Sequence, residues 1–133
     1  MKKLMKLAGI ALASLAIASC NNPVDLSGKW EISEVGGQTI EASEHTPFME
    51  FDVENHRVHG HTGVNIMNGS YTLEGNKLSL GQMATTMMAG PMEDMELERT
   101  ILDTIEKSAK VKAADNTLQL LDADGKVIMV LKK

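Results

Sequence analysis

Cysteine is nearly absent from this chain of 133 residues, which contains Cys20 and no other. A single thiol excludes a disulfide bond within the chain, although an oxidising compartment would permit one. The sequence also contains no Gly-x-Ser-x-Gly elbow and no glycine-rich phosphate loop with its lysine. These absences favour a protein without enzymatic activity and without a cofactor.

Aromatic residues and cations are scarce as well. Aromatics make up 3% of the chain, and we expect Trp30, Phe48, Phe51 and Tyr71 to anchor a core filled by aliphatic residues and methionine. Three of the 13 Lys and Arg residues lie within the first six positions, which leaves ten cations against 18 acids and a net charge of −8. Such a surface argues against nucleic acid as a partner and against electrostatic binding to anionic lipid.

The first twenty residues have the pattern of a bacterial lipoprotein signal. A start with three lysines precedes the apolar run LAGIALASLAIAS, and the segment ends in Ile-Ala-Ser-Cys, which looks like a lipobox. We therefore expect a signal peptide over residues 1–19, acyl chains such as palmitate on Cys20, and a tether over residues 20–27. Each buried methylene contributes about 0.8 kcal/mol, so acylation holds a protein on a membrane without a transmembrane helix. Asn21 stands where aspartate would favour the inner membrane, so we expect anchoring to the outer membrane, facing the periplasm.

Alternating apolar and polar residues predict short antiparallel strands along residues 28–133, which we assign to one domain. Single strands are expected at residues 28–35, 48–53 and 58–61. A hairpin of two strands is expected over residues 70–80, and three further strands are expected within residues 110–132. The expected turns carry Gly75-Asn76, Asp115-Asn116 and Asp124-Gly125. The last strand is apolar on both faces, which predicts that both faces are covered.

The strongest helix pattern covers residues 91–107. Gly90-Pro91 suits a helix start, and an apolar stripe follows, formed by Leu97, Ile101, Leu102 and Ile105. Glu98 falls within the arc of that stripe, although it is a carboxylate. The whole pattern predicts an α+β fold, with a curved, barrel-like antiparallel sheet and one helix packed across it.

Five methionines lie between Gln82 and Glu96: Met83, Met87, Met88, Met92 and Met95. Thioethers fill irregular gaps in protein cores, form adaptable partner surfaces and bind soft metals such as cuprous ion. We favour packing and expect at least Met83 and Met88 to be buried against Trp30, Leu80 and Ile101. The copper alternative uses Met87, Met88 and Met92.

A second cluster combines histidines and carboxylates. A four-residue hairpin turn after residue 53 would set Asp52 opposite His59 and Glu50 opposite His61 on one face. Two imidazoles and two carboxylates are candidate ligands for zinc. We favour the simpler interpretation, in which these residues form opposite-charge pairs on a solvated face.

Several motifs, in their order and spacing, resemble the META domain, the family of the HslJ-type bacterial envelope lipoproteins. They are Trp30 with Ile32; Gly60, Thr62, Gly63, Asn65, Gly69 and Tyr71; Thr85, Thr86, Met88 and Ala89; and Asp122 with Gly125. The resemblance covers about residues 26–132. Val64 and Gly90 occupy two positions at which the family pattern has cysteines, so a cysteine pair that other members could form is missing here.

The resemblance implies a fold and an envelope role but no reaction. The glycines of the Gly60–Gly69 segment are best interpreted as bends or as places of close approach within the sheet. Asn65, Tyr71 and Thr86 are candidates for locking a loop or contacting a ligand. We expect a monomeric, lipid-anchored, non-enzymatic protein with a binding, structural or stress-protective role, whose partners are the membrane and an envelope protein. The alternative is a lipoprotein that binds copper or zinc.

Overall fold

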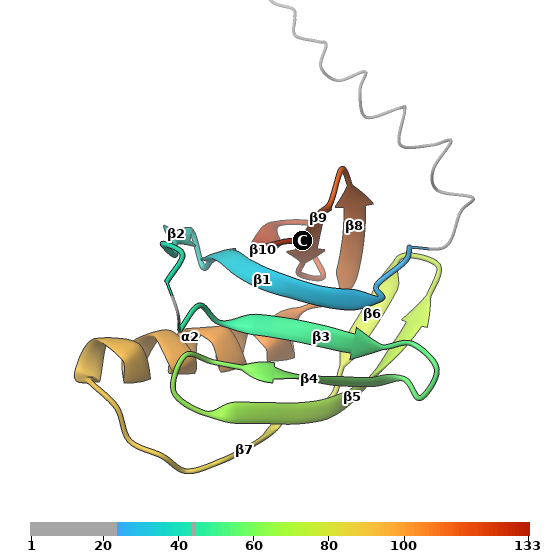
Figure 1. Ribbon diagram of the computed structural model, residues 1–133. Helices are drawn as coiled ribbons and strands as arrows, with labels where there is room; N and C mark the ends of the chain where they lie inside the picture. Colours follow the sequence, from blue (N-terminus) through green and yellow to red (C-terminus); the bar gives the residue numbers. More distant parts are fainter. Residues whose placement is uncertain (1–23, 44) are drawn as a thin grey trace, which may run out of the picture.

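The computed structural model describes residues 24–43 and 45–133, which form a closed antiparallel β-barrel with one helix packed across it (Figure 1). Eight strands close the ring in the order β1, β10, β9, β8, β6, β5, β4, β3. They are β1 (Gly28–Val35), β3 (Phe48–Asp52), β4 (Arg57–His61), β5 (Ile66–Glu74), β6 (Lys77–Leu80), β8 (Lys110–Ala114), β9 (Thr117–Leu121) and β10 (Val127–Lys132). The predicted fold class is confirmed.

Strand β1 closes the barrel because it pairs on both sides. One edge pairs with β3, and the other pairs with β10 near the end of the chain. Two short strands extend this ring: β2 (Gln38–Thr39) pairs with β1, and β7 (Ala84–Thr85) pairs with the first half of β5. The first and last strands of the ring are therefore neighbours, and the barrel has no free edge at that point.

Two hairpin turns have the residues that tight turns require. Leu73–Leu78 and Glu74–Lys77 pair across Gly75-Asn76, and Ala114 pairs with Thr117 across Asp115-Asn116. Asp115 and Asn116 both have positive φ, at 46° and 62°, a conformation that Asn and Asp tolerate better than most residues. The predicted positions of both turns are confirmed.

The residues expected in the barrel interior from the alternating pattern are buried there, with one exception among the aromatic residues. Trp30 is 4% exposed, and its indole Nε1–H donates to the Leu26 carbonyl at 2.9 Å. Phe51 and Tyr71 are buried and meet edge to face with ring centroids 5.3 Å apart. Phe48 is only half-buried and lies under the Lys29 ammonium at 4.3 Å, so it is a surface residue rather than a core anchor.

The outer face of β10 is less covered than the sequence predicted. Met129 and Leu131 point into the barrel and are buried. On the opposite face Ile128 and Val130 are half-buried, and a register irregularity at the start of the strand leaves Val127 41% exposed.

Helix α2 (Met92–Lys107) lies within one residue of its predicted bounds. Pro91 precedes its first turn, which carries Glu93 and Asp94 at the positive end of the helix dipole. Ile101 and Ile105 are buried in the barrel core, and Leu97 and Leu102 pack against it. The predicted apolar stripe is therefore the face that meets the barrel.

No helix within the described residues is long and apolar enough to cross a membrane. The expected signal peptide, the lipidation site Cys20 and most of the expected tether lie outside the residues that the structure describes.

Candidate functional site

The buried amide of Asn65 joins the turn after β4 to the segment that precedes α2. Its Oδ1 accepts hydrogen bonds from the Thr86 hydroxyl at 2.8 Å and the Met88 main-chain N–H at 2.7 Å. Its Nδ2 donates to the Met88 carbonyl at 3.1 Å and to Glu98 Oε1 at 2.8 Å. A carboxamide has two donors and two acceptor sites, so Asn65 uses its full capacity here. We call this network the Asn65 clamp.

Thr62 and Glu98 complete the clamp from its other side. The Thr62 hydroxyl donates to Glu98 Oε1 at 2.7 Å and accepts from the main-chain N–H groups of Val64 and Asn65. These bonds explain why Glu98 lies within the apolar stripe of α2, since its carboxylate binds the turn that the helix covers. The position of Glu98 within an apolar stripe was the signal in the sequence for a buried polar contact. The sequence did not indicate that its partners are Thr62 and Asn65.

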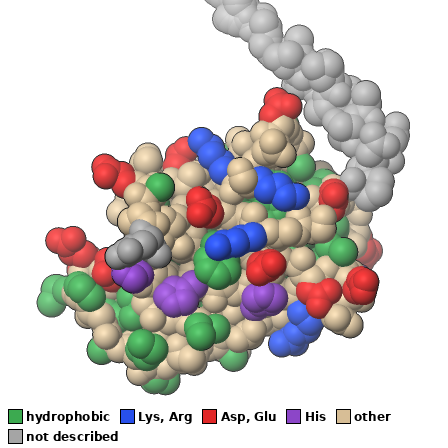
Figure 2. All heavy atoms as spheres, viewed as in Figure 1, with side chains coloured by type: hydrophobic (Ala, Val, Ile, Leu, Met, Phe, Trp, Pro, Cys, Tyr) green, Lys and Arg blue, Asp and Glu red, His purple; other side chains and the backbone are tan. Residues whose placement is uncertain are grey.

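The segment held by the clamp, residues 86–92, is the methionine loop. It leads from β7 to the first residue of α2, and its methionines are exposed: Met87 by 93%, Met88 by 61% and Met92 by 77%. Nearby Ile66, which pairs through its main chain with Thr86, is 51% exposed. Figure 2 shows hydrophobic side chains gathered at the lower left of this face, where β7 and the start of α2 lie in Figure 1.

The predicted burial of Met88 is wrong. Asn65 binds both the N–H and the carbonyl of Met88, so the main chain occupies the inner position and the side chain is left outside. Met83 is half-buried and packs against the core, and Met95 is half-buried on α2. The stretch thus divides into partly packed ends and an exposed centre.

The glycines of the β4–β5 segment allow close approach, as predicted. A Cβ on Gly60 would collide with the main-chain carbonyl of Phe48 on the paired strand β3. A Cβ on Gly69 would lie 2.7 Å from Met83 Sδ, which is too short for a carbon–sulfur contact. Gly69 therefore makes room for Met83 against the barrel wall.

The expected register of the β3–β4 hairpin is wrong by two residues. Glu50 lies opposite His59, Phe48 opposite His61 and Asp52 opposite Arg57. The turn begins earlier because the Asp52 carboxylate accepts from the main-chain N–H groups of Glu54 and Asn55 and from the Asn55 side chain. The hydrogen bond from the Asn55 side chain is the main cause of the lowered pKa of Asp52.

The structure does not bring the histidines and carboxylates of this hairpin together around one point. His59 Nε2 lies 3.3 Å from Glu50 Oε1, and both side chains are about half exposed. His61 instead accepts the Gly63 N–H on Nδ1 at 2.9 Å, and its ring stacks on Phe48. Across residues 24–43 and 45–133, no three His, Cys, Asp or Glu side chains converge in a way that could hold a metal ion. The surface pair of Glu50 and His59 is worth a few tenths of a kcal/mol.

Tyr71, the third loop-locking candidate, lies apart from the Asn65 clamp. Its ring is buried in the core against Phe51, and it also meets the ring of His56, an exposed residue of the turn between β3 and β4. Burial raises the pKa of its phenol, and the nearby charge of Asp52 raises it further. The structure therefore assigns Tyr71 to the core.

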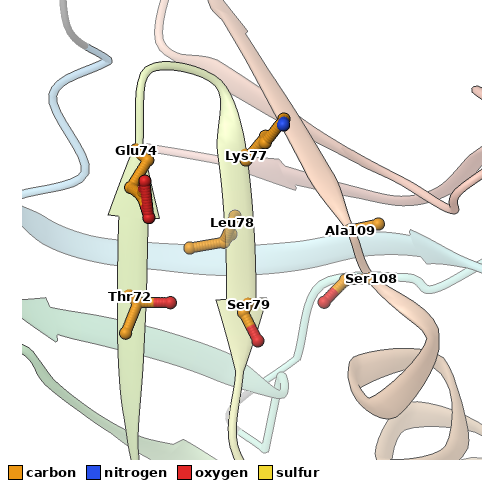
Figure 3. Close-up of a pocket in the computed structure, with 7 residues that line it drawn as sticks. All are labelled: Thr72, Glu74, Lys77, Leu78, Ser79, Ser108 and Ala109. Carbon is orange, nitrogen blue, oxygen red and sulfur yellow. The ribbon is translucent and has the colours of Figure 1, made fainter.

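A cavity of about 280 Å³ opens where strands β6 and β8 diverge (Figure 3). The two strands pair at Lys77 and Lys110, and main-chain hydrogen bonds from Leu78 to Ala109 and from Val111 to Asn76 flank this short junction. The cavity is lined by Thr72, Glu74, Lys77, Leu78, Ser79, Ser108 and Ala109. Ser79 and Ser108 face the gap between the strands in Figure 3, and the side chains of the clamp and the methionine loop do not contribute to it.

Val64 and Gly90 lie against each other beside the clamp. A Cβ on Gly90 would lie 3.9 Å from Val64 Cβ, within the range of about 3.5–4.5 Å that disulfides require. The two positions at which the family pattern has cysteines are therefore close enough to be bonded in this fold. In this chain the two Val64 methyl groups lie 3.3 Å from the position that a Cβ on Gly90 would occupy, so the Val64 side chain fills the space beside Gly90.

Asn65→Ala tests the clamp. The substitution removes the partner of the Met88 N–H and one of the two donors to the Glu98 carboxylate, which keeps its hydrogen bond from Thr62. We therefore expect the free energy of unfolding to fall by about 2–4 kcal/mol. Urea denaturation measures this loss, and hydrogen exchange should show that the Met88 amide loses protection. Asn68→Ala, on an exposed position of β5, is the matched control and should change stability by less than about 0.5 kcal/mol. If the Met88 amide keeps its protection against hydrogen exchange in Asn65→Ala, the clamp is refuted.

The double variant Val64→Cys and Gly90→Cys tests whether these two positions lie side by side. In a chain that also carries Cys20→Ser, the two new thiols should form a disulfide on air oxidation and stabilise the protein by about 3 kcal/mol. Chemical denaturation with and without reductant gives the difference, and Val64→Cys alone is the control. If both thiols still react with a thiol reagent after oxidation, the two segments do not lie together as described.

Solved structures with the same fold include two NMR structures and one crystal structure. One NMR structure matches with a TM-score of 0.63 and 24% sequence identity, and the match covers 80% of this chain and 89% of that chain. An NMR structure of a protein from Burkholderia xenovorans has a TM-score of 0.63 and 20% identity, covering 86% of each chain. The crystal structure of a DUF4847 family protein from Bacteroides vulgatus has a TM-score of 0.57 and 9% identity, covering 80% of this chain and 92% of that one. At these identities the likeness shows the fold alone.

The family is shown by sequence as well as by fold. No curated protein matches the chain. The family model of the META domain, however, matches residues 24–133, which span the barrel, the clamp and the helix. The motif residues that suggested this family include Thr62, Asn65 and Thr86, which the structure brings together in one network. The chain belongs to the META domain family.

Proposed function

We propose that this protein is a lipid-anchored, non-enzymatic module of the bacterial outer membrane that binds another envelope protein through its methionine loop. The observation that carries the proposal is the exposure of three large apolar side chains, Met87, Met88 and Met92, on one short segment. Exposed apolar groups that lie together mark interaction surfaces, and methionine is enriched where a surface must adapt to its partner.

The clamp supports this proposal because it reduces the entropic cost of binding. Main-chain hydrogen bonds to Asn65 hold the loop at Met88, while the flexible thioether side chains remain free to adapt. A partner would therefore not have to order the loop itself, and ordering costs are a large part of the unfavourable free energy of association.

The position of the loop relative to the expected anchor also supports a protein partner rather than the lipid surface. In Figure 1 the described chain enters β1 at the right, and the methionine loop lies at the lower left, at the other end of the barrel. An anchor before residue 24 would be joined to the end of the barrel opposite the loop, so the loop would remain accessible from the periplasm. The monomer then presents its apolar residues where another envelope protein can reach them.

The copper alternative rests on the same three thioethers and has less support. A soft metal needs about three ligands that converge on one ion. A side chain that is 93% exposed, as Met87 is, contacts almost nothing and so does not converge with its neighbours in this structure. If the alternative holds instead, cuprous ion will raise the melting temperature of the wild type but not that of Met88→Leu, by mass action.

Cys20→Ala tests the anchor. Without its sole thiol the chain cannot be acylated at that position, so we expect the protein to be released from the outer membrane or mislocalised. Cell fractionation and metabolic labelling with a palmitate analogue measure this change, and Ser19→Ala, which keeps a small residue before the cysteine, is the control. A wild-type protein that takes up no lipid label would refute the anchor.

A photo-crosslinking residue at Met87 tests the binding surface. In cells, we expect a discrete adduct with an envelope protein at this position. The same residue at Asp115, in the exposed turn between β8 and β9, is the matched control and should give none. Adducts of equal yield at both positions, or no adduct at Met87, Met88 or Met92, would contradict the proposal.

A further inference from the structure

The eight methionines of the described domain fall into two extreme classes and an intermediate one. Met87, Met88 and Met92 are 93%, 61% and 77% exposed, whereas Met49, Met67 and Met129 are at most 1% exposed. Met83 and Met95 lie between these limits. The exposed class is thus confined to the methionine loop, and the buried class belongs to the strands of the barrel.

No cysteine is present among the described residues, so methionine is the only sulfur there that an oxidant can attack. A thioether reacts with two-electron oxidants such as peroxides and hypochlorous acid to give methionine sulfoxide. Methionine sulfoxide reductases reverse this step with a dithiol as the reductant: the dithiol supplies two electrons and two protons and becomes a disulfide, and the oxygen leaves as water. Hydrogen peroxide is uncharged, so the acidic surface of the protein does not repel it. Access to the sulfur therefore decides which methionines react.

We propose that the methionine loop is a reversible oxidation site, at which peroxide or hypochlorous acid converts an apolar surface into a polar one without unfolding the barrel. With peroxide, a lone pair on Sδ attacks one oxygen, and an S–O bond forms as the O–O bond breaks. The departing hydroxide takes the proton from the transferred oxygen and leaves as water. The sulfur loses two electrons and the peroxide gains them.

The clamp explains why oxidation at the loop spares the fold. Asn65 binds the main chain of Met88 and the hydroxyl of Thr86, and no thioether takes part in the network. A sulfoxide on an exposed side chain is solvated where it forms. The same group on Met49 or Met67 would place a polar S–O bond in the apolar core, which is unfavourable without a hydrogen-bond partner.

The reactivity of the loop and the retention of the fold can both be measured on the isolated full-length protein, without a partner and without acyl chains. A failed oxidation test would leave the binding function untouched, and a failed binding test would leave the oxidation site untouched.

Graded hydrogen peroxide followed by peptide mass spectrometry tests the proposal. We expect Met87, Met88 and Met92 to gain one oxygen about tenfold faster or more than Met49, Met67 and Met129. The oxidised protein should keep its melting temperature, elute earlier from a hydrophobic-interaction column, and return to its original elution after treatment with methionine sulfoxide reductases.

The triple variant Met87→Leu, Met88→Leu and Met92→Leu is the matched control. It keeps the side-chain volume and apolar character but removes the reactive sulfurs, so its elution should not change under the same peroxide treatment. Similar oxidation rates in the two classes would overturn the proposal. A melting temperature that falls in step with oxidation of the loop would overturn it as well, because the clamp would then not insulate the fold.

Discussion

The hydrogen bonds of the Asn65 carboxamide are the interaction on which the arrangement of the methionine loop depends. Asn65 is 2% exposed and joins three segments that are far apart in sequence: the turn after β4, the methionine loop and helix α2. A buried amide that lacked any of these partners would carry the cost of desolvation without compensation. Every donor and acceptor of the amide has a partner in this arrangement, which holds the main chain at Met88 in place.

The barrel supplies the rigid frame that makes this clamp effective. Because β1 pairs with both β3 and β10, the ends of the fold are held together, and α2 packs its buried isoleucines on the closed core. Glu98 then lies at a fixed height above the turn that carries Thr62 and Asn65. Asn65 binds the main chain of the loop between β7 and α2 on its inner side, and the apolar side chains of the loop lie on the surface.

This arrangement separates stability from surface chemistry. The groups that hold the loop are polar and lie on its inner side: the side chains of Thr62, Asn65, Thr86 and Glu98. The groups that a partner or an oxidant would meet are thioethers exposed on the surface. Changes in the exposed methionines can therefore alter what the surface binds or reacts with, while the core and the clamp keep the fold. A surface of this kind suits both proposals made for the protein, although neither requires the other.

The amino-acid sequence by itself determined the features that depend on near neighbours: the alternation of the strands, the turns at Gly75-Asn76 and Asp115-Asn116, the burial of Trp30 and the start of α2 at Pro91. It also contained the motifs that placed the chain in its family. The local pattern did not predict the register of β3 and β4. There the Asp52 carboxylate accepts a hydrogen bond from the main chain of Asn55, and the turn begins earlier than expected. Only the tertiary structure decided that the methionines at the centre of their segment face outward. That outcome depends on hydrogen bonds from Asn65 to a residue 23 positions away and to Glu98 33 positions away, and periodicity in a sequence does not report contacts at such separations.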